Sequence, residues 1–297
     1  MNDHSDKRAD QSQRFLFEGA DIRGETVQLE GALREILGLH QYAPGVGRLL
    51  GEFLAAAVLL STTLKFQGRL TLQARSEGQV PLIMAECDSE LQIRGIARGA
   101  QEATAEQFDL LLGGGQLAIT VDPLKGRRYQ GVVPLGEDSL AHSLDAYFRQ
   151  SEQLGTRLWL ACDGQRAGGL LLQQLPAQLA QDPELRAQHW EHACTLAATL
   201  ESTELLALES REVIHRLYHA DPLTLFEPRP VAFQCSCSRE RSLNALSALA
   251  TGELEEILEE RGMVEMDCEF CNAQYHFSRE DLTLLLGPER GDGATVH

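Results

Sequence analysis

The sequence is short of positive charge. Its 297 residues include 26 Lys and Arg against 44 Asp and Glu, which gives a formal net charge of −18. Binding to nucleic acid needs clustered Lys and Arg that neutralise phosphates, and attraction to an anionic membrane surface needs the same clusters. The composition therefore argues against nucleic acid and against a membrane surface as partners of this chain.

The sequence also lacks the apolar segments that direct a chain to a membrane or across it. Residues 1–13 are polar and contain no apolar stretch of the kind found in a secretory signal peptide. The most apolar run, residues 49–64, carries Glu52 and is short for a transmembrane helix. We therefore expect a cytoplasmic protein, in which thiols stay reduced.

A phosphate-binding loop is missing as well. The run Gly113-Gly114-Gly115 has neither the Lys nor the Ser/Thr of a P-loop, and an expected strand follows it instead of a helix. We interpret these glycines as a turn.

Cysteine is sparse but concentrated. Four of the seven cysteines form two pairs, Cys235-Ser-Cys237 and Cys268-Glu-Phe-Cys271. Tetrahedral zinc takes thiolates from two such loops, although C-x-C is tighter than the commonest zinc spacing. The pattern favours a closed structural zinc site, which leaves no open position for a hydrolytic water. Two other interpretations stay open: a pair of permanent disulfides in an exported chain, and a thioredoxin-type site at Cys268 and Cys271.

The charged neighbours of the two pairs differ in sign. Asp267 and Glu269 flank the second pair, so we expect them to raise the pKa of its thiols in the absence of metal. Arg239 and Arg241 follow the first pair and are expected to favour its thiolates.

Other possible ligands fit simpler interpretations. The histidine pairs at helical spacing are read as solvated helix faces, and His276 is not needed once four cysteines complete a tetrahedron. These pairs are His189 with His192 and His215 with His219. The three isolated cysteines lie in apolar stretches and are read as packing residues: Cys87, Cys162 and Cys194.

The pattern of elements predicts an α+β fold. Strands and helices follow each other without regular βαβ alternation, and a nearly all-apolar helix is expected over residues 46–60. Gly168-Gly169 is expected to separate the last two strands of the large domain. We expect a disordered tail over 1–14, an α+β core domain over 15–178, a helical linker over 179–230 and a zinc domain over 231–297.

The linker and the zinc domain are both expected to have little stability when isolated from the rest of the protein. Short acidic helices, with Ser202 and Ser210 as expected N-caps, are unstable alone in water and must dock on a neighbour. The zinc domain is small enough to need a metal staple. We therefore expect loss of zinc to unfold this domain and to remove the docking partner of the linker.

Several blocks carry a specific resemblance. From about Phe15 to the C-terminus the chain resembles the bacterial redox-regulated heat-shock chaperone, the 33-kilodalton chaperonin family. The agreement lies in Cys235-Ser-Cys237-Ser-Arg-Glu-Arg241, Cys268-Glu-Phe-Cys271, Tyr129-Gln-Gly-Val-Val133, Ala167-Gly-Gly-Leu-Leu-Leu-Gln173, Leu64-Lys-Phe-Gln-Gly68 and Val213-Ile-His-Arg-Leu-Tyr-His219.

The resemblance implies an ATP-independent holdase and no enzymatic activity. In the family, four cysteines bind one Zn²⁺ in the reduced, inactive form; here they are Cys235, Cys237, Cys268 and Cys271. Peroxide or hypochlorous acid would form the disulfides Cys235–Cys237 and Cys268–Cys271 and release the metal. The zinc domain and the linker would then unfold, the protein would dimerise, and the exposed surface would hold unfolding client proteins.

Two alternatives remain at this point. A zinc-ribbon regulatory protein would need a basic face near the cysteines, yet the insert between them is rich in glutamate, with Glu253, Glu255, Glu256, Glu259 and Glu260. A thiol oxidoreductase would turn over a dithiol substrate, and replacement of Cys268 alone would abolish that turnover.

Overall fold

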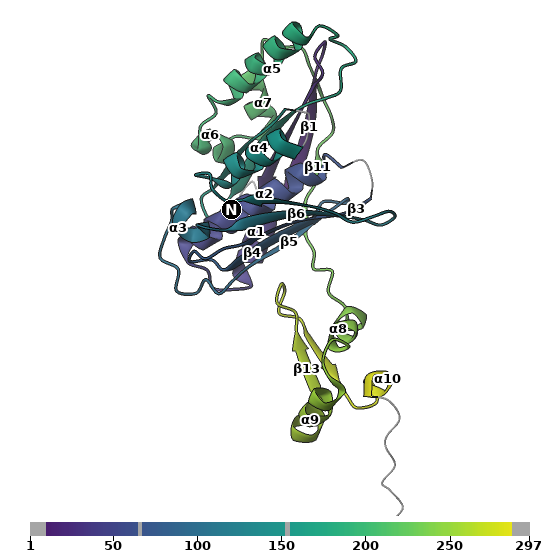
Figure 1. The fold of residues 1–297 in the computed structure, drawn as a ribbon. Helices are drawn as coiled ribbons and strands as arrows, with labels where there is room; N and C mark the ends of the chain where they lie inside the picture. The colour runs from purple at the N-terminus through teal and green to yellow at the C-terminus, as the bar shows by residue number, and fades with distance from the viewer. Residues whose placement is uncertain (1–9, 65–66, 152–154, 287–297) are drawn as a thin grey trace, which may run out of the picture. The chain divides into compact units, whose positions relative to one another are not determined.

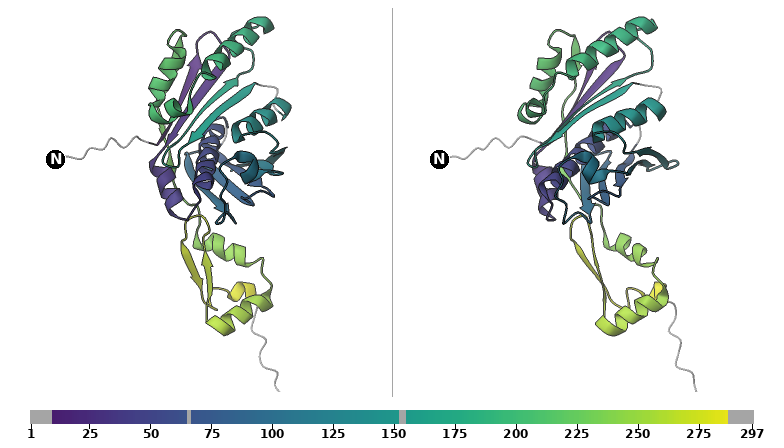
Figure 2. Two further views of the ribbon diagram at one scale, coloured as in Figure 1. Left: turned by 90° about the vertical axis from the view of Figure 1, so that its left-hand side faces the viewer. Right: turned by 60° about the vertical axis from the view of Figure 1, so that its left-hand side comes forward.

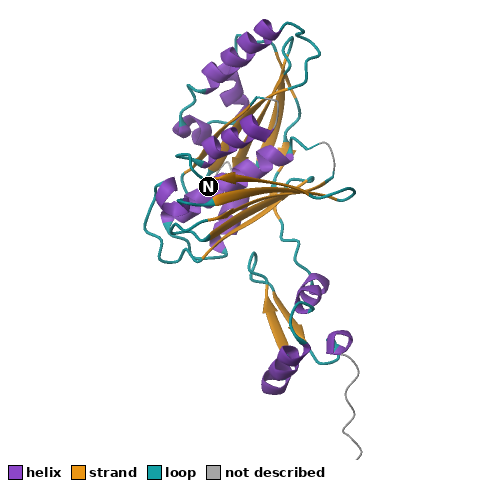
Figure 3. Cartoon of the chain, in the orientation of Figure 1, coloured by secondary structure: helices purple, strands orange, loops and turns teal. Residues whose placement is uncertain are grey.

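The computed structural model describes residues 10–64, 67–151 and 155–286. The chain divides into two compact units, Met1–Gln234 and Cys235–His297. Figures 1 and 3 show helices and strands mixed in both units, which confirms the predicted α+β class. Residues 1–9 of the expected tail and residues 287–297 of the expected zinc domain lie outside the described residues.

The first unit contains two six-stranded sheets that are mostly antiparallel. The first sheet has the order β10-β1-β2-β9-β8, and β11 also pairs with β1. Its strands are β1 (Gln11–Phe17), β2 (Ile22–Leu29), β8 (Thr156–Cys162), β9 (Ala167–Gln174), β10 (Leu223–Leu225) and β11 (Arg229–Pro230). Strand β1 starts four residues before the expected start of the core at residue 15. The prediction of a disordered tail is therefore wrong for residues 11–14, because they pair with β2.

The second sheet has the order β12-β5-β4-β3-β6-β7. Its strands are β3 (Gly68–Arg75), β4 (Leu82–Asp88), β5 (Gln92–Arg98), β6 (Gln116–Pro123), β7 (Tyr129–Pro134) and β12 (Ala232–Phe233). Strand β12 pairs with β5 in parallel, and the other pairs are antiparallel. The alternating burial of β3 and β4 is what a sheet with one covered face requires.

Helix α2 (Pro44–Ser61) forms the centre of this unit and contacts strands of both sheets (Figure 2). Pro44 is the first residue of the helix, where a backbone N–H has no acceptor within the helix, so the missing N–H of proline costs nothing there. The helix is long and apolar enough to cross a bilayer, but 83% of that window is buried inside the protein. It is therefore the core helix that the sequence predicted over residues 46–60.

The glycines of β9 explain how closely α2 approaches the first sheet. A Cβ atom on Gly169 would lie 2.7 Å from Leu59 Cδ1, and one on Gly168 would lie 3.1 Å from the Leu205 carbonyl oxygen. Both glycines therefore lie inside a strand that is covered on both faces. The expectation that they separate two strands is wrong; Asp163 to Arg166 form that turn, with Gly164 at φ 90°.

Three further helices complete this part of the unit, α1 (Gly31–Gly38), α3 (Phe108–Leu112) and α4 (Leu140–Ser151). The Asp10 carboxylate accepts hydrogen bonds from the Glu30, Gly31 and Ala32 N–H groups at the start of α1. A side chain 20 residues upstream thus caps this helix, as carboxylates at N-termini commonly do.

Helices α5 (Pro183–Ala197), α6 (Ser202–Ala207) and α7 (Ser210–Tyr218) cover the outer side of the first sheet (Figure 2). Ser202 and Ser210 are their first helical residues and not the expected N-caps. Ser210 is buried and its N–H donates to Gln28 Oε1 at 3.2 Å, so its position is fixed by contact with the sheet.

An apolar cluster attaches these helices to the sheet. From the helices come Ala193, Ala197, Val213, Ile214, Leu217 and Tyr218, and from the sheet come Phe15, Phe17, Ile22, Leu170 and Leu172. The cluster consists of residues of the first unit and contains no zinc ligand. The linker helices thus dock on the first sheet, as their marginal stability required, and their release after loss of zinc stays a prediction.

The second unit is small. It consists of α8 (Arg239–Leu246), α9 (Thr251–Arg261), the hairpin β13 (Val264–Asp267) and β14 (Gln274–Phe277), and α10 (Thr283–Leu286). Its described core contains six buried apolar residues: Leu246, Leu254, Leu258, Val264, Phe277 and Leu282. A core of this size is poor for a module of about 60 residues, which commonly needs a metal or disulfides.

Candidate metal centre

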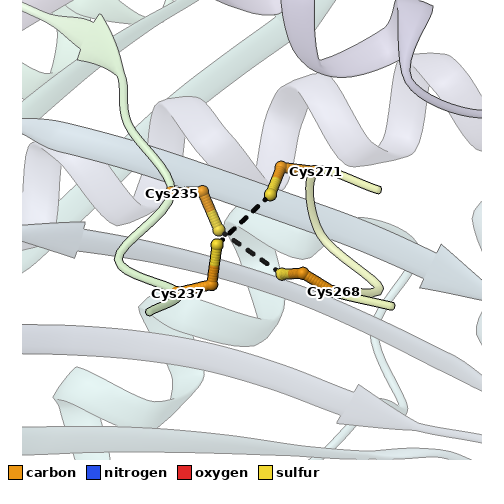
Figure 4. A group of neighbouring side chains, drawn as sticks. All are labelled: Cys235, Cys237, Cys268 and Cys271. Atoms are coloured by element: carbon orange, nitrogen blue, oxygen red, sulfur yellow. Dashed lines mark hydrogen bonds between the residues drawn. The ribbon is translucent and has the colours of Figure 1, made fainter. Parts of the chain in front are cut away.

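Two short loops bring the four paired cysteines together. Cys235 and Cys237 precede α8, and Cys268 and Cys271 lie in the turn between β13 and β14 (Figure 4). In that turn the Cys268 carbonyl accepts from the N–H groups of Cys271 at 3.2 Å and Asn272 at 2.7 Å. Asn272 has a φ of 58°, a left-handed conformation that asparagine tolerates better than most residues. The turn thus points both thiols of the second pair the same way.

The distances between the sulfur atoms fit a tetrahedral ion. All four Sγ atoms lie within 4.8 Å of one another. The Cys235 and Cys268 sulfurs are 3.6 Å apart, and those of Cys237 and Cys271 are 3.4 Å apart. Four thiolates at about 2.3 Å from a zinc ion would be separated by about 3.8 Å. An all-sulfur set of this kind suits zinc, and none of these four cysteines forms a disulfide.

The pKa values of both thiols of the second pair are raised, which favours the protonated form. Burial is the largest cause that raises the pKa of Cys268 and Cys271, contact with neighbouring thiols adds to it, and backbone N–H groups oppose it. The predicted direction is correct, but the predicted cause, charge on Asp267 and Glu269, is not the leading one. Because a metal ligand must be a thiolate, metal binding at this site releases protons and weakens at low pH.

Tyr275 is a residue of the site that the sequence reasoning missed. Its hydroxyl lies on β14 and donates to Cys237 Sγ at 3.2 Å. This hydrogen bond is the largest cause that raises the pKa of Tyr275, to about 12. Its place in the sequence could have indicated this contact. Tyr275 follows Cys271 by four residues on the second strand of the hairpin, from which its side chain can reach the loop of the first pair.

Arg239 has a structural role in the second unit. Its guanidinium donates to the His276 carbonyl at 2.6 Å, pairs with Asp281 at 2.7 Å and lies 4.6 Å from the centroid of the Phe277 ring. The Arg239 hydrogen bond is also the main reason that the pKa of Asp281 falls to about 2. Arg239 therefore connects the start of α8 to β14 and to the segment before α10.

Arg241 also acts on the backbone. It donates to the carbonyl of Ser236 at 2.6 Å, which is the residue between the two cysteines of the first pair. The two arginines thus help to fix the loop that presents the first pair, and their expected effect on its thiolates stays a prediction.

The remaining candidates lie apart from the four cysteines. His276 is 3.5 Å from Glu265, and His192 bonds Asp221. The rings of His215 and His219 are 5.9 Å apart, and the described residues add no third ligand to either histidine pair. Burial raises the pKa of the isolated thiols, to about 12 for Cys87 and Cys162 and about 11 for Cys194.

Comparisons with known proteins agree with the family suggested by the sequence. A family model described as "Hsp33 protein" matches residues 10–278. The "33 kDa chaperonin" of Pseudomonas paraeruginosa is 53% identical over 294 residues, which cover 97% of this chain and 99% of that protein. The protein of the same name from Azotobacter vinelandii is 51% identical over 293 residues, with 97% and 99% coverage.

A solved structure has the same fold. The crystal structure of the 33 kDa chaperonin from Thermotoga maritima superposes with a TM-score of 0.78 at 25% identity, and the match covers 93% of this chain and 97% of that chain. From the family model, the relatives and the fold together, the chain belongs to the Hsp33 protein family, the family of the 33 kDa chaperonins.

Proposed function

We propose that this protein is an ATP-independent holdase chaperone that oxidants switch on. Its reduced form would hold one Zn²⁺ through Cys235, Cys237, Cys268 and Cys271 and would be inactive. The observation that carries the proposal is the convergence of these four thiols within 4.8 Å in a unit with a small core. The bound ion would supply cross-linking of the two cysteine loops, and its binding free energy, about 10–16 kcal/mol in finger peptides, would be folding free energy.

Oxidation acts on the sulfurs. Two thiols and one hydrogen peroxide give one disulfide and two waters, so two peroxides oxidise the four cysteines. We propose that the bonds are Cys235–Cys237 and Cys268–Cys271, as the resemblance to the family implies. The sulfur contacts at 3.6 Å and 3.4 Å instead join one cysteine of each loop, whereas a disulfide requires about 2.05 Å. Forming bonds within each pair therefore dissolves the tetrahedral arrangement and removes the link between the two loops.

The two disulfides cannot replace that link. Each would close a loop of only a few residues, and short loops remove little entropy from the unfolded chain. The second unit would be left with six buried apolar residues to hold its helices and hairpin. We therefore propose that the second unit, Cys235–His297, forms the redox-switch domain and unfolds after oxidation. Residues 231–234 would stay with the first unit, because β12 pairs with β5.

The linker would supply the second part of the switch. In the proposed division, residues 15–178 form the core domain and residues 179–230 the linker, whose helices α5 and α7 cover apolar residues of the first sheet. Release of these helices would expose Phe15, Phe17, Ile22, Leu170 and Leu172. A contiguous apolar surface on a chain of net charge −18 suits a client binder that stays soluble.

The partners follow from the same proposal. They are unfolding proteins, and a second copy of the chain in the oxidised form, as the family implies. The acidic composition disfavours nucleic acid and anionic membranes. We propose a cytoplasmic location and no catalytic turnover.

Zinc content, free thiols and suppression of client aggregation, measured before and after peroxide, test the proposal. We expect one zinc and four protected thiols in the reduced protein, and loss of both together with a gain of chaperone activity after oxidation. A Cys268→Ser, Cys271→Ser double variant should retain no zinc. Zinc retention in that variant, or aggregation suppression that is equal in both redox states, would contradict the proposal.

A further inference from the structure

A cavity of about 550 Å³ lies in the first unit, beyond the C-terminal end of α2. Both sheets line it: Arg23 and Gln173 come from the first, and Leu70, Ile119 and Val121 from the second. Its volume falls within the range of about 300–1,000 Å³ that is usual for small-molecule sites. The cavity is remote in sequence from the paired cysteines, and the proposed redox switch does not use it.

The walls are apolar and aromatic with few polar groups. Tyr147 and Phe148 on α4 and Tyr129 on β7 form one side. The hydroxyls of Tyr129 and Tyr147 lie 3.0 Å apart and bond to each other, which fixes both rings. The last carbonyls of α2 already accept bonds; Leu60 O, for example, receives the Thr63 N–H and hydroxyl. The walls therefore present mainly hydrocarbon to an occupant.

Arg23 is the charged exception. Of the described residues that line the cavity, it alone carries a formal charge at neutral pH. One of its terminal nitrogens donates to Gln173 Oε1 at 2.5 Å, whereas its buried Nε meets no hydrogen-bond acceptor among the described residues. A buried donor without a partner costs about 1–3 kcal/mol, and more on a charged group.

The nearby acid does not fully compensate this cation. Glu25 lies two residues further along β2 on the same face, but its carboxylate accepts from the Ser12 hydroxyl, and Arg14 and Arg229 act on it as well. Burial is the largest cause that lowers the pKa of Arg23, because it removes water from the charged guanidinium. A planar guanidinium can bind the two oxygens of a carboxylate through two parallel hydrogen bonds.

We propose that this cavity binds one amphipathic carboxylate, a fatty-acid-type anion, with its head on the Arg23 guanidinium and its hydrocarbon chain against the aromatic and aliphatic walls. The carboxylate would pair with the positive charge of Arg23, and the hydrocarbon chain would fill apolar space in the cavity. The proposal concerns the first unit only and holds whether or not the redox switch operates as proposed.

Isothermal titration calorimetry on the reduced, zinc-loaded full chain tests it with three probes of equal length below their micellar concentrations: octanoate, octylammonium and 1-octanol. We expect saturable binding of one octanoate, with at least about tenfold weaker binding of octylammonium, as a charge-assisted hydrogen bond implies. Arg23→Gln should weaken octanoate about tenfold and leave 1-octanol unchanged. Arg75→Gln, an exposed arginine at the far end of β3, is the matched control and should change neither.

Two further variants keep the result decisive if Arg23→Gln folds poorly. Arg23→Lys retains the charge but loses the planar fork, so octanoate binding should weaken less than in Arg23→Gln. Val121→Phe fills the cavity and should weaken octanoate and 1-octanol together. Equal affinity for octanoate and octylammonium, no saturable binding of octanoate, or an unchanged octanoate affinity in Arg23→Gln would overturn the proposal.

Discussion

The hydroxyl of Tyr275 donates a hydrogen bond to Cys237 Sγ at 3.2 Å, and it joins strand β14 to the loop before α8. This hydrogen bond thus links the two cysteine-bearing segments through protein atoms, without the help of a metal ion. A hydrogen bond to a thiolate also stabilises the charged form of the sulfur and lowers its nucleophilicity. Tyr275 is therefore placed to slow oxidation and to favour retention of a metal.

Replacing Tyr275 with Phe should speed activation. The ring and its packing remain, and only the donor to Cys237 is lost. We expect the variant to lose zinc to a chromogenic chelator several-fold faster and to react several-fold faster with peroxide. Rates of zinc release and thiol loss, followed in the same sample, measure both effects.

The matched control is Tyr129→Phe, which removes the hydroxyl that bonds Tyr147 in the first unit. This variant should release zinc at the rate of the parent protein. Equal rates for Tyr275→Phe and the parent would show that the bond to Cys237 has no influence on the switch.

The isolated cysteines should be dispensable for the redox response. Burial raises the pKa of Cys87 and Cys162 to about 12 and that of Cys194 to about 11, so almost no thiolate is present at neutral pH to attack an oxidant. Cys87→Ala, Cys162→Ala and Cys194→Ala should each keep the zinc content and the peroxide response of the parent. Loss of peroxide activation in any of them would add that cysteine to the switch.

The four-cysteine site could be predicted from the sequence because the spacing within each cysteine pair is short. Each pair lies within a few residues, so both of its thiols reach one point whatever the rest of the chain does. Tyr275 and Arg239 could not be assigned in this way, since their roles depend on how the hairpin and α8 meet. Arg239 sits beside the first pair in sequence, yet its guanidinium bonds the His276 carbonyl and Asp281.

The docking of the linker depends on contacts of still longer range. Tyr218 contacts Phe17 with ring centroids 4.9 Å apart across about 200 residues of chain. Helical periodicity showed that α7 needed an apolar partner but could not identify the strand that provides it. Gly168 and Gly169 likewise resemble turn residues in the sequence, and only the closeness of Leu59 and Leu205 explains why they lie within a strand.

A partly buried acid in α2, Glu52, makes the stability of the first unit depend on pH. Burial is the main cause that raises the pKa of Glu52 to about 7 from an ordinary value of 4.5, and Arg48 opposes the shift. Between these two pH values the folded state binds more protons than the unfolded state. The free energy of unfolding therefore falls as pH rises through this window, by up to about 3 kcal/mol from this one group.

Glu52→Gln should remove that dependence. Relative to the parent, the variant should gain about 2–3 kcal/mol at pH 8 and little at pH 4.5. Urea unfolding followed by tryptophan fluorescence measures this in the first unit, because both tryptophans, Trp159 and Trp190, lie there. Glu35→Gln on the exposed face of α1 is the control, and an equal gain in both variants at pH 8 would point to net charge instead of burial.

The contact between Tyr218 and the first sheet keeps the proposed client-binding surface covered in the reduced protein. Tyr218 is buried against Phe15 and Phe17, and its hydroxyl donates to the Ala193 carbonyl at 3.1 Å, which ties α7 to α5. Truncating a buried aromatic side chain costs about 3–5 kcal/mol. The helices that cover the sheet would then open far more often, although the zinc site is untouched.

Tyr218→Ala should therefore act as a partly activated chaperone without oxidant. We expect faster hydrogen exchange over residues 183–218 in the reduced protein, partial suppression of client aggregation, and the zinc content of the parent. Leu179→Ala, which shortens a side chain that is 65% exposed in the same segment, should leave all three unchanged. If Tyr218→Ala speeds exchange over α5–α7 yet gives no chaperone activity before peroxide, the sheet face under these helices is not the client surface. Oxidation of the second unit must then create that surface itself, from the chain that unfolds around the released cysteines.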